Sequence, residues 1–318
     1  MKIVIPAPLT LVSTNIPEPD TANGDPAVYD SGTTYNTGDK ACVLATHRIY
    51  EALADGVVGV FPPDDLSSDT PKWAVVDTTN RWKALDAGLS NEDVSVAYID
   101  TQSVQPGEIS YEVGASKCSL VALFNVQAEK ITFSVKEDGV VVEGPHEVAM
   151  VEATATNFYE WYFSPIRMRR NVLHGFGAGL SQTLVIQATS SGGSDVKIGS
   201  IIVGNEQYVG STKSGVKGSI EGYAVEQRDS YGRWYVRKGL MQSNAELTLY
   251  IDAANISWVK NLFSDMTGVP TVFIHDNVDD VGDAMECLIQ FGLIDGFEYP
   301  LERKSGKNEC TLKCKGLT

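Results

Sequence analysis

Alternating apolar and polar residues dominate the chain and predict strands rather than helices. Over residues 87–205, eight strand-length runs are separated by turn residues, and this spacing predicts a two-sheet β-sandwich. The runs are Val94–Tyr98, Ile109–Val113, Leu120–Phe124, Ile131–Val135, Val140–Val142, Tyr159–Phe163, Leu184–Ala188 and Val196–Gly204.

Residues 206–318 combine strands with one helix, which predicts an α+β domain in which that helix covers a sheet. Residues 225–237 indicate a hairpin that turns at Asp229–Gly232. After Asn255, apolar residues at helical spacing predict a helix that ends before Gly268 and Pro270. The apolar face consists of Ile256, Val259, Leu262, Phe263 and Met266, and strands are expected at 245–252, 271–274, 286–291, 296–301 and 309–315.

The first 86 residues predict an arm followed by a small β module. Residues 1–26 begin apolar and become rich in proline and small polar residues, which indicates an extended arm or linker lying on its own domain or on a neighbouring subunit. In residues 27–86, short strands alternate with turns around Tyr35, Tyr50 and Trp73. A core of that size is marginal by itself, so the module is expected to dock on its neighbour. The predicted fold class is mainly β.

Charge and cysteine content narrow the function classes. The 318-residue chain carries a formal charge of −16, which disfavours nucleic acid as a partner. Its apolar runs are too short to span a membrane, and no signal peptide is apparent at Met1, so we expect synthesis in the cytoplasm. The five cysteines have no Cys-x-x-Cys spacing, and we expect them to be reduced and mostly buried. Cys310 and Cys314 are at best a weak indication of metal binding.

Catalytic patterns are missing from the sequence, so we predict neither enzymatic activity nor a cofactor or metal. The histidines are scattered without a known metal or nucleophile motif, and each is interpreted as a strand or turn residue. The acidic run 275–283 has the wrong register for a calcium loop. The four histidines are His47, His146, His174 and His275.

The aromatic residues of the module have a recognisable spacing. Tyr29, Tyr35, Gly38-Asp39, Tyr50, Pro62 and Trp73 follow one another as in the chitin-binding type of carbohydrate-binding module, families five and twelve, which this segment resembles. The resemblance implies that the internal aromatics hold the fold. The alternative is that Tyr29, Tyr50 and Trp73 form a platform that binds sugar, since exposed aromatic faces stack on sugars.

Asn80, Arg81 and Trp82 follow the last strand of the module and are candidate interface residues. Trp73 and Trp82 bracket a Thr-Asn-Arg turn, in which Arg81 can form a two-pronged pair with a carboxylate such as Asp86. A clamp between two domains and a ligand site are both compatible with this pattern.

The order of the parts resembles virion proteins of tailed bacteriophages. After the module come a segment similar to a galactose-binding-like jelly roll, ending in 197–204, and then Gln207–Thr212 and Asp229–Arg233. The resemblance implies a structural protein of the tail tip, baseplate or tail fibre, located in the virion. Its expected partners are copies of itself and other tail proteins, with a role in host attachment. A protein that binds cell-surface glycan is the second hypothesis, and an enzyme acting on polysaccharide is the third.

Overall fold

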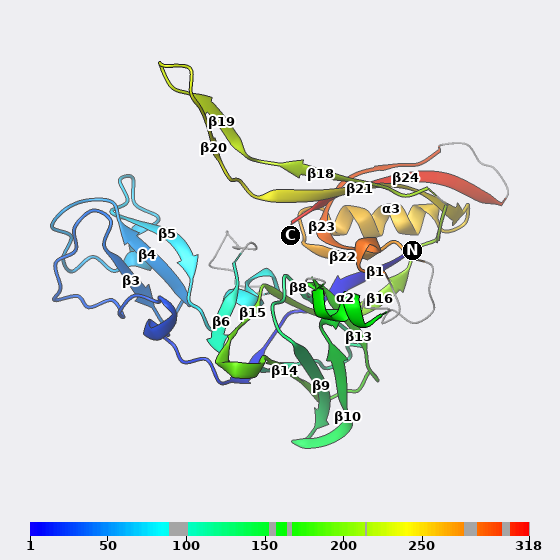
Figure 1. Cartoon of the computed structure of the whole chain (residues 1–318), viewed down its shortest axis with the longest axis horizontal. Helices are drawn as coiled ribbons and strands as arrows, with labels where there is room; N and C mark the ends of the chain where they lie inside the picture. The colour runs from blue at the N-terminus through cyan, green and yellow to red at the C-terminus, as the bar shows by residue number, and fades with distance from the viewer. Residues whose placement is uncertain are drawn as a thin grey trace.

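A computed structural model describes residues 1–88, 101–152, 157–163, 167–213, 215–276, 285–300 and 306–317. The protein is mainly β, with a β-sandwich and a domain in which one helix covers a sheet (Figure 1). The expected strand Val94–Tyr98 and most of the acidic run 275–283 lie outside the described residues.

A large antiparallel sheet extends through both of these parts. Its strand order is β13-β8-β16-β1-β22-β23-β24-β21-β17, and β18 also pairs with β21. The strands are β13 (Val172–Gly175), β8 (Leu120–Phe124), β16 (Ser200–Tyr208), β1 (Lys2–Pro6), β22 (Thr271–Ile274), β23 (Ile289–Glu298), β24 (Lys307–Gly316), β21 (Met241–Asp252), β17 (Ser211–Thr212) and β18 (Lys217–Gly222).

Strand β1 lies in the middle of this sheet and corrects two sequence expectations. It pairs with β16 on one side and with β22 on the other. The predicted arm or linker over residues 1–26 is therefore wrong for residues 1–14, because their apolar start is an internal strand and Leu11–Thr14 forms β2 at the edge of a second sheet. The expected boundary between 205 and 206 falls inside β16, so the sandwich and the C-terminal part share one sheet.

The second sheet has five strands and completes the sandwich. Its order is β10 (Val140–Ala149), β9 (Lys130–Glu137), β14 (Gln182–Thr189), β7 (Glu108–Gly114) and β2. In β7, β9 and β14 alternate residues are buried, as expected for strands with one face on a core. The inward residues include Tyr111, Phe133 and Ile186, which pack with Val121 and Val203 of the larger sheet.

Helix α3 (Ile256–Asp265) confirms the predicted helix and covers the other end of the large sheet. Val259 and Phe263 are buried against Leu249 of β21 and Leu312 of β24. Asn255 occupies the N-cap position, but its side chain makes no capping hydrogen bond. Among the described residues, no helix has the length and apolar character needed to cross a membrane.

The N-terminal module is a three-stranded sheet of β3 (Lys40–Val43), β4 (Arg48–Ala52) and β5 (Trp73–Thr78), followed by a short helix-like segment, η2 (Lys83–Gly88). The short helix α1 (Pro62–Asp65) lies between β4 and β5. The core of the module contains Tyr35, Tyr50 and Trp73, as the sequence predicts. The Trp73 indole N–H donates to the carbonyl of Val60 at 3.1 Å.

Two predicted strands differ from the structure. The predicted strand at 159–163 is instead part of a helix, α2 (Phe158–Phe163). Aromatic residues favour strands only where their side chains pack against neighbouring strands of a sheet. The run 196–204 is divided between β15 (Asp195–Ile198), which pairs with β6 (Ser103–Pro106), and β16. Gly199 lies between them, where a Cβ would come within 2.9 Å of the Phe124 carbonyl oxygen.

The remaining elements are short. The sheet β11 (Val151–Glu152) with β12 (Arg167–Met168), the hairpin β19 (Val225–Arg228) with β20 (Trp234–Arg237), and the turns η1 (Thr21–Asn23), η3 (Ser191–Gly193) and η5 (Glu286–Leu288) complete the described elements.

Candidate functional site

Tyr50 and Trp73 form the interior of the module and do not present a sugar platform. Their exposed fractions are 2% and 0%. Rings at this depth offer no face to a ligand, so both residues have the core role that the resemblance implies, and the alternative sugar platform is wrong for them. Tyr29 is only partly buried, and its ring stacks on Tyr35 with the centroids 5.7 Å apart. The exposed ring beside it is Phe61, which the sequence interpretation did not select.

Asn80 connects three parts of the chain. Its side-chain amide donates to Asp20 and to the Val104 carbonyl, both at 2.7 Å, and its Oδ1 accepts from the Val104 backbone N–H at 2.8 Å. Its own N–H donates to Asp25 at 3.0 Å. Because these partners lie in the N-terminal segment and in β6, Asn80 holds the module against the sandwich within one chain.

Trp82 adds further contacts through Glu18, and we call Asn80, Trp82 and Glu18 with their hydrogen-bond partners the clamp. The indole N–H of Trp82 donates to Glu18 at 2.9 Å, the Thr79 hydroxyl donates to it at 2.8 Å, and His47 Nδ1 lies 3.0 Å from it. His47 also stacks on Trp82 with ring centroids 4.0 Å apart. Burial tends to raise the pKa of the Glu18 carboxyl, but these hydrogen bonds outweigh it and hold the pKa below its ordinary value.

Arg81 does not pair with Asp86 as its spacing suggested. Asp86 accepts both prongs of Arg48 instead, at 2.7 and 2.8 Å, while the backbone carbonyl of Arg81 accepts the Tyr111 hydroxyl at 2.8 Å. The candidate interface residues Asn80, Arg81 and Trp82 thus all contact other segments of their own chain.

Glu143 and His146 are brought to one face of β10 by a bulge. Residues three apart on a regular strand point to opposite faces. Here Glu143 lies opposite Val135 and His146 lies opposite Phe133, so the pair Gly144 and Pro145 spans a single partner position. Both side chains therefore point to the same side of the sheet as Val135 and Phe133, which is the side of the sandwich core. Glu143 Oε1 and His146 Nε2 are 3.5 Å apart.

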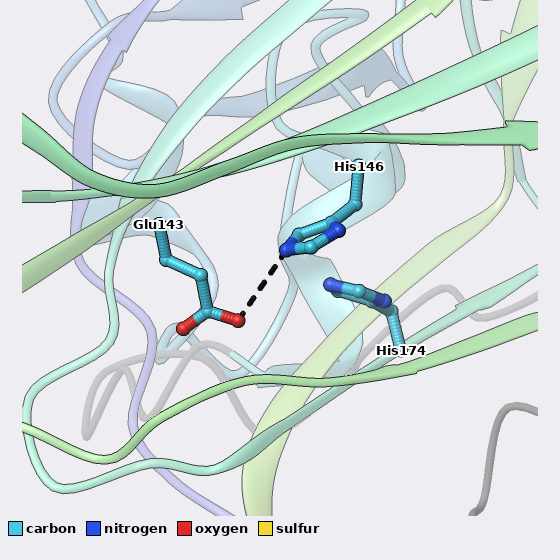
Figure 2. Close-up of side chains that lie close together, drawn as sticks. All are labelled: Glu143, His146 and His174. Carbon is cyan, nitrogen blue, oxygen red and sulfur yellow. Dashed lines mark ion pairs between the residues drawn. The ribbon is translucent and has the colours of Figure 1, made fainter.

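His174 approaches the same point from the opposite sheet. It follows Val172 by two residues on β13, and both side chains face the five-stranded sheet. Its ring stacks on Phe133, with centroids 4.8 Å apart, and lies 5.1 Å from the His146 ring. Figure 2 shows the three side chains converging, with Glu143 and His146 joined by an ion pair. One donor atom from each residue lies within 4.8 Å of the other two.

This Glu-His-His cluster was missed by sequence reasoning, which assigned each histidine separately to a strand or turn. The spacing Glu143-Gly-Pro-His146 and a histidine far along the chain match no compact ligand motif. The available signal was Gly144-Pro145 inside a strand, since this dipeptide marks a bulge that changes the face of the residues around it.

The predicted cysteine burial is confirmed for four of the five residues. Cys42, Cys118, Cys310 and Cys314 are buried free thiols, whereas Cys287 is exposed. Burial raises the pKa of the Cys42 thiol to about 11, which keeps it protonated and weakly nucleophilic at neutral pH.

The ribbon, defined as residues 217–241, projects from the large sheet (Figure 1). It contains β18, the hairpin β19–β20 and the first residue of β21, and its turn at Asp229–Gly232 confirms the predicted hairpin. Asp229 Oδ1 accepts the backbone N–H groups of Tyr231 and Arg233 at 3.0 and 2.8 Å. Every residue of β18, β19 and β20 is exposed, so both faces of the ribbon are uncovered.

Each face of the ribbon carries an aromatic residue beside a polar partner. Trp234 lies opposite Arg228, whose guanidinium carbon is 4.0 Å from the ring centroid. Tyr235 lies opposite Gln227 on the other face and donates its hydroxyl to the Gln227 side chain. Further large apolar residues are exposed along the ribbon: Ile220, Tyr223, Val225, Tyr231, Val236, Leu240 and Met241.

Comparison with protein-family models, with curated proteins and with solved structures finds no match to this chain. The ribbon, the clamp and the Glu-His-His cluster are therefore the features that bear on function.

The charge of the ribbon is opposite to that of the whole chain. It contains five cationic residues (Lys217, Arg228, Arg233, Arg237 and Lys238) and three acidic ones (Glu221, Glu226 and Asp229), whereas the chain carries a formal charge of −16. The ribbon is thus a locally basic, apolar projection on an acidic protein, which makes it complementary in charge to acidic protein surfaces.

Proposed function

We propose that this chain is a structural subunit of a bacteriophage tail, and that it assembles with further copies of itself through the ribbon. The observation that carries the proposal is the exposure of aromatic and apolar side chains on both faces of a two-stranded hairpin. An isolated hairpin of this kind is marginally stable in water, and contiguous exposed apolar surface marks an interaction site.

A second copy of the chain is the occupant that the charges favour. Outside the ribbon the chain carries a larger acidic excess than its formal charge of −16, because the ribbon contributes more cationic than acidic residues. Two ribbons would repel each other, whereas a ribbon and the acidic body of a neighbouring copy attract. The contact is therefore heterologous, and such contacts generate rings when the rotation closes.

A further aromatic surface supports an assembled state. Helix α2 exposes Phe158, Tyr159, Tyr162 and Phe163. Soluble monomers seldom leave such groups of rings uncovered, since covering them releases roughly 25 cal/mol per Å² of apolar area. Assembly with neighbouring subunits covers this surface as well as the ribbon.

The tail assignment depends on the order of the parts, which resembles virion proteins of tailed bacteriophages. It fits a protein whose module is locked to its sandwich by buried polar contacts such as Asn80 with Asp20 and Val104. A rigid connection of this kind suits a structural subunit that holds its neighbours in fixed positions within a particle. Mass spectrometry of purified virions from the phage that encodes the chain tests the assignment, and absence of the chain from the particles would refute it.

Sedimentation velocity of the full chain tests the self-assembly. We expect the wild type to sediment as an oligomer and the variant Trp234→Ser/Tyr235→Ser to sediment as a monomer with unchanged circular dichroism. Leu180→Ser is the matched control, because Leu180 is a large apolar residue exposed outside the ribbon. A wild-type monomer at every concentration tested, or an oligomer unaffected by the ribbon substitutions, would count against the ribbon as the contact.

A further inference from the structure

We propose that Glu143, His146 and His174 form a binding site for a divalent transition-metal ion, with Zn²⁺ as its representative. Two imidazoles and one carboxylate are a ligand set that Zn²⁺ uses when three protein groups bind it and a water completes the coordination. The site is independent of the assembly proposed above, because none of its residues belongs to the ribbon.

The distances between the donor atoms fit such an ion. With bonds of about 2.1 Å in tetrahedral geometry, neighbouring ligand atoms are about 3.4 Å apart. Glu143 Oε1 and His146 Nε2 already lie at 3.5 Å. All three donor atoms fall within 4.8 Å of one another, so the side chains approach each other further when an ion binds.

Two neighbouring groups orient the ligands. The backbone N–H of Gly177 donates to Glu143 Oε2 at 2.9 Å, which leaves Oε1 directed at His146. The ring of Phe133 lies nearly parallel to that of His174, at an interplanar angle of 10°, and restricts its tilt. Groups that fix ligand orientation in this way strengthen metal binding.

The site is open to solvent on one side. The His146 side chain is 50% exposed and that of Glu143 is 34% exposed, so an ion can reach them without unfolding of the sandwich. The exposure also leaves room for a water ligand. An ion here has three protein ligands rather than the closed set of four found in most structural zinc sites.

Metal binding would join the two sheets of the sandwich. Glu143 and His146 come from β10 in the five-stranded sheet, whereas His174 comes from β13 in the large sheet. An ion held by both strands is a cross-link at the margin of the core. Because it binds the folded state only, it raises the unfolding temperature, and the rise continues with the logarithm of the free ion concentration above the dissociation constant.

The experiment is a calorimetric titration of the full chain with Zn²⁺ after removal of metal, in a Cys287→Ser background that eliminates the exposed thiol. We expect one ion per chain, and a rise in unfolding temperature with added Zn²⁺. His146→Ala and Glu143→Gln are expected to weaken binding by about 100-fold or more, since loss even of an orienting group costs 10- to 100-fold. His174→Gln is expected to weaken Zn²⁺ binding to a similar extent.

The matched control is Glu147→Gln, which removes an exposed carboxylate on the same strand that pairs with Lys130. It should bind Zn²⁺ as the wild type does. Visible absorption of bound Co²⁺ gives a second readout, since the intensity of its bands distinguishes tetrahedral from octahedral coordination. The proposal is overturned if the wild type binds no ion, or if binding survives His146→Ala, which would show that Glu143 and His146 form an ion pair and nothing more.

Discussion

Arg48 and Asp86 form a two-pronged ion pair in which both side chains are buried, with exposed fractions of 4% and 0%. Arg48 lies on β4 of the module and Asp86 lies on η2, after the last strand of the module. The hydroxyl of Thr78 joins the pair by donating to Asp86 at 3.1 Å. The pair therefore attaches the end of the module to its sheet.

Removal of one partner of this pair should destabilise the protein strongly. Arg48→Met leaves the Asp86 carboxylate buried without its cation, and we expect a loss of roughly 3–5 kcal/mol in the free energy of unfolding. Urea unfolding followed by tryptophan fluorescence measures it. Lys40→Met is the control, because the exposed Lys40–Glu51 pair contributes less than about 1 kcal/mol. A double variant, Arg48→Met/Asp86→Leu, should lose less than Arg48→Met alone, and an equal or larger loss would contradict the argument.

Glu18 should make the clamp sensitive to acid. Its pKa is lower in the folded protein than its ordinary value of 4.5, so ionised Glu18 stabilises the fold above that pH, and the contribution is lost as the pH falls through the folded pKa. Glu18→Gln removes the ionised acceptor and is expected to cost about 1–3 kcal/mol at pH 7. Urea midpoints at pH 7, 5, 4 and 3 should show the two proteins converging at the acidic end. Glu51→Gln is the control, and a gap that stays constant with pH would rule out the role of the charge.

Gly144 should be essential to the bulge that aligns Glu143 with His146. Its φ is +92°, and an added Cβ would lie 2.6 Å from the Phe133 carbonyl oxygen. Gly139 also has a positive φ, +82°, but open space around it. We expect Gly139→Ala to cost about 1–2 kcal/mol, from the left-handed conformation alone, and Gly144→Ala to cost more. Thermal unfolding compares them, and calorimetry should show weaker Zn²⁺ binding for Gly144→Ala only. Equal effects of the two substitutions would refute the alignment by the bulge.

Assembly through the ribbon should weaken at high salt. The attraction between the basic ribbon and an acidic neighbour is screened as the Debye length falls from about 10 Å at 0.1 M to 3 Å at 1 M. Sedimentation velocity at these two ionic strengths should therefore show dissociation at the higher one. Arg237→Glu should weaken the oligomer at low salt, whereas Lys130→Glu, the same charge change on the five-stranded sheet, should not. Stronger association at 1 M salt would indicate a contact that depends on apolar burial alone.

Local signals in the sequence were enough for the elements that depend on neighbouring residues. Helix α3 follows from apolar residues at helical spacing, and the ribbon turn follows from Asp229–Gly232. The predicted partner of Asp86 was wrong because the fold brings Arg48 to it from 38 residues earlier in the chain, whereas sequence proximity favoured Arg81. The position of β1 was also missed, since alternation identifies a strand but carries no information about which distant strands will pair with it.

The same limit applies to the Glu-His-His cluster. His146 and His174 lie on different sheets, and only the packing of those sheets brings their rings within 5.1 Å. The bulge at Gly144 and Pro145 shifts Glu143 to the side of His146, which a regular alternation does not predict. Side chains that converge from separate sheets require the three-dimensional fold before they can be recognised together.

The central position of β1 determines when the large sheet can finish folding during synthesis. The ribosome makes Lys2–Pro6 before the strands that flank it, and the paired residues Gly204–Tyr208 and Val272–Ile274 emerge only much later. At roughly 5–20 residues per second, the earliest strand waits on the order of tens of seconds for its last partner. During this interval Ile3 and Val4, which end in separate cores, lack the surfaces that will cover them. Nascent chains stalled before residue 272 should accordingly engage chaperones, and release should coincide with translation of β22.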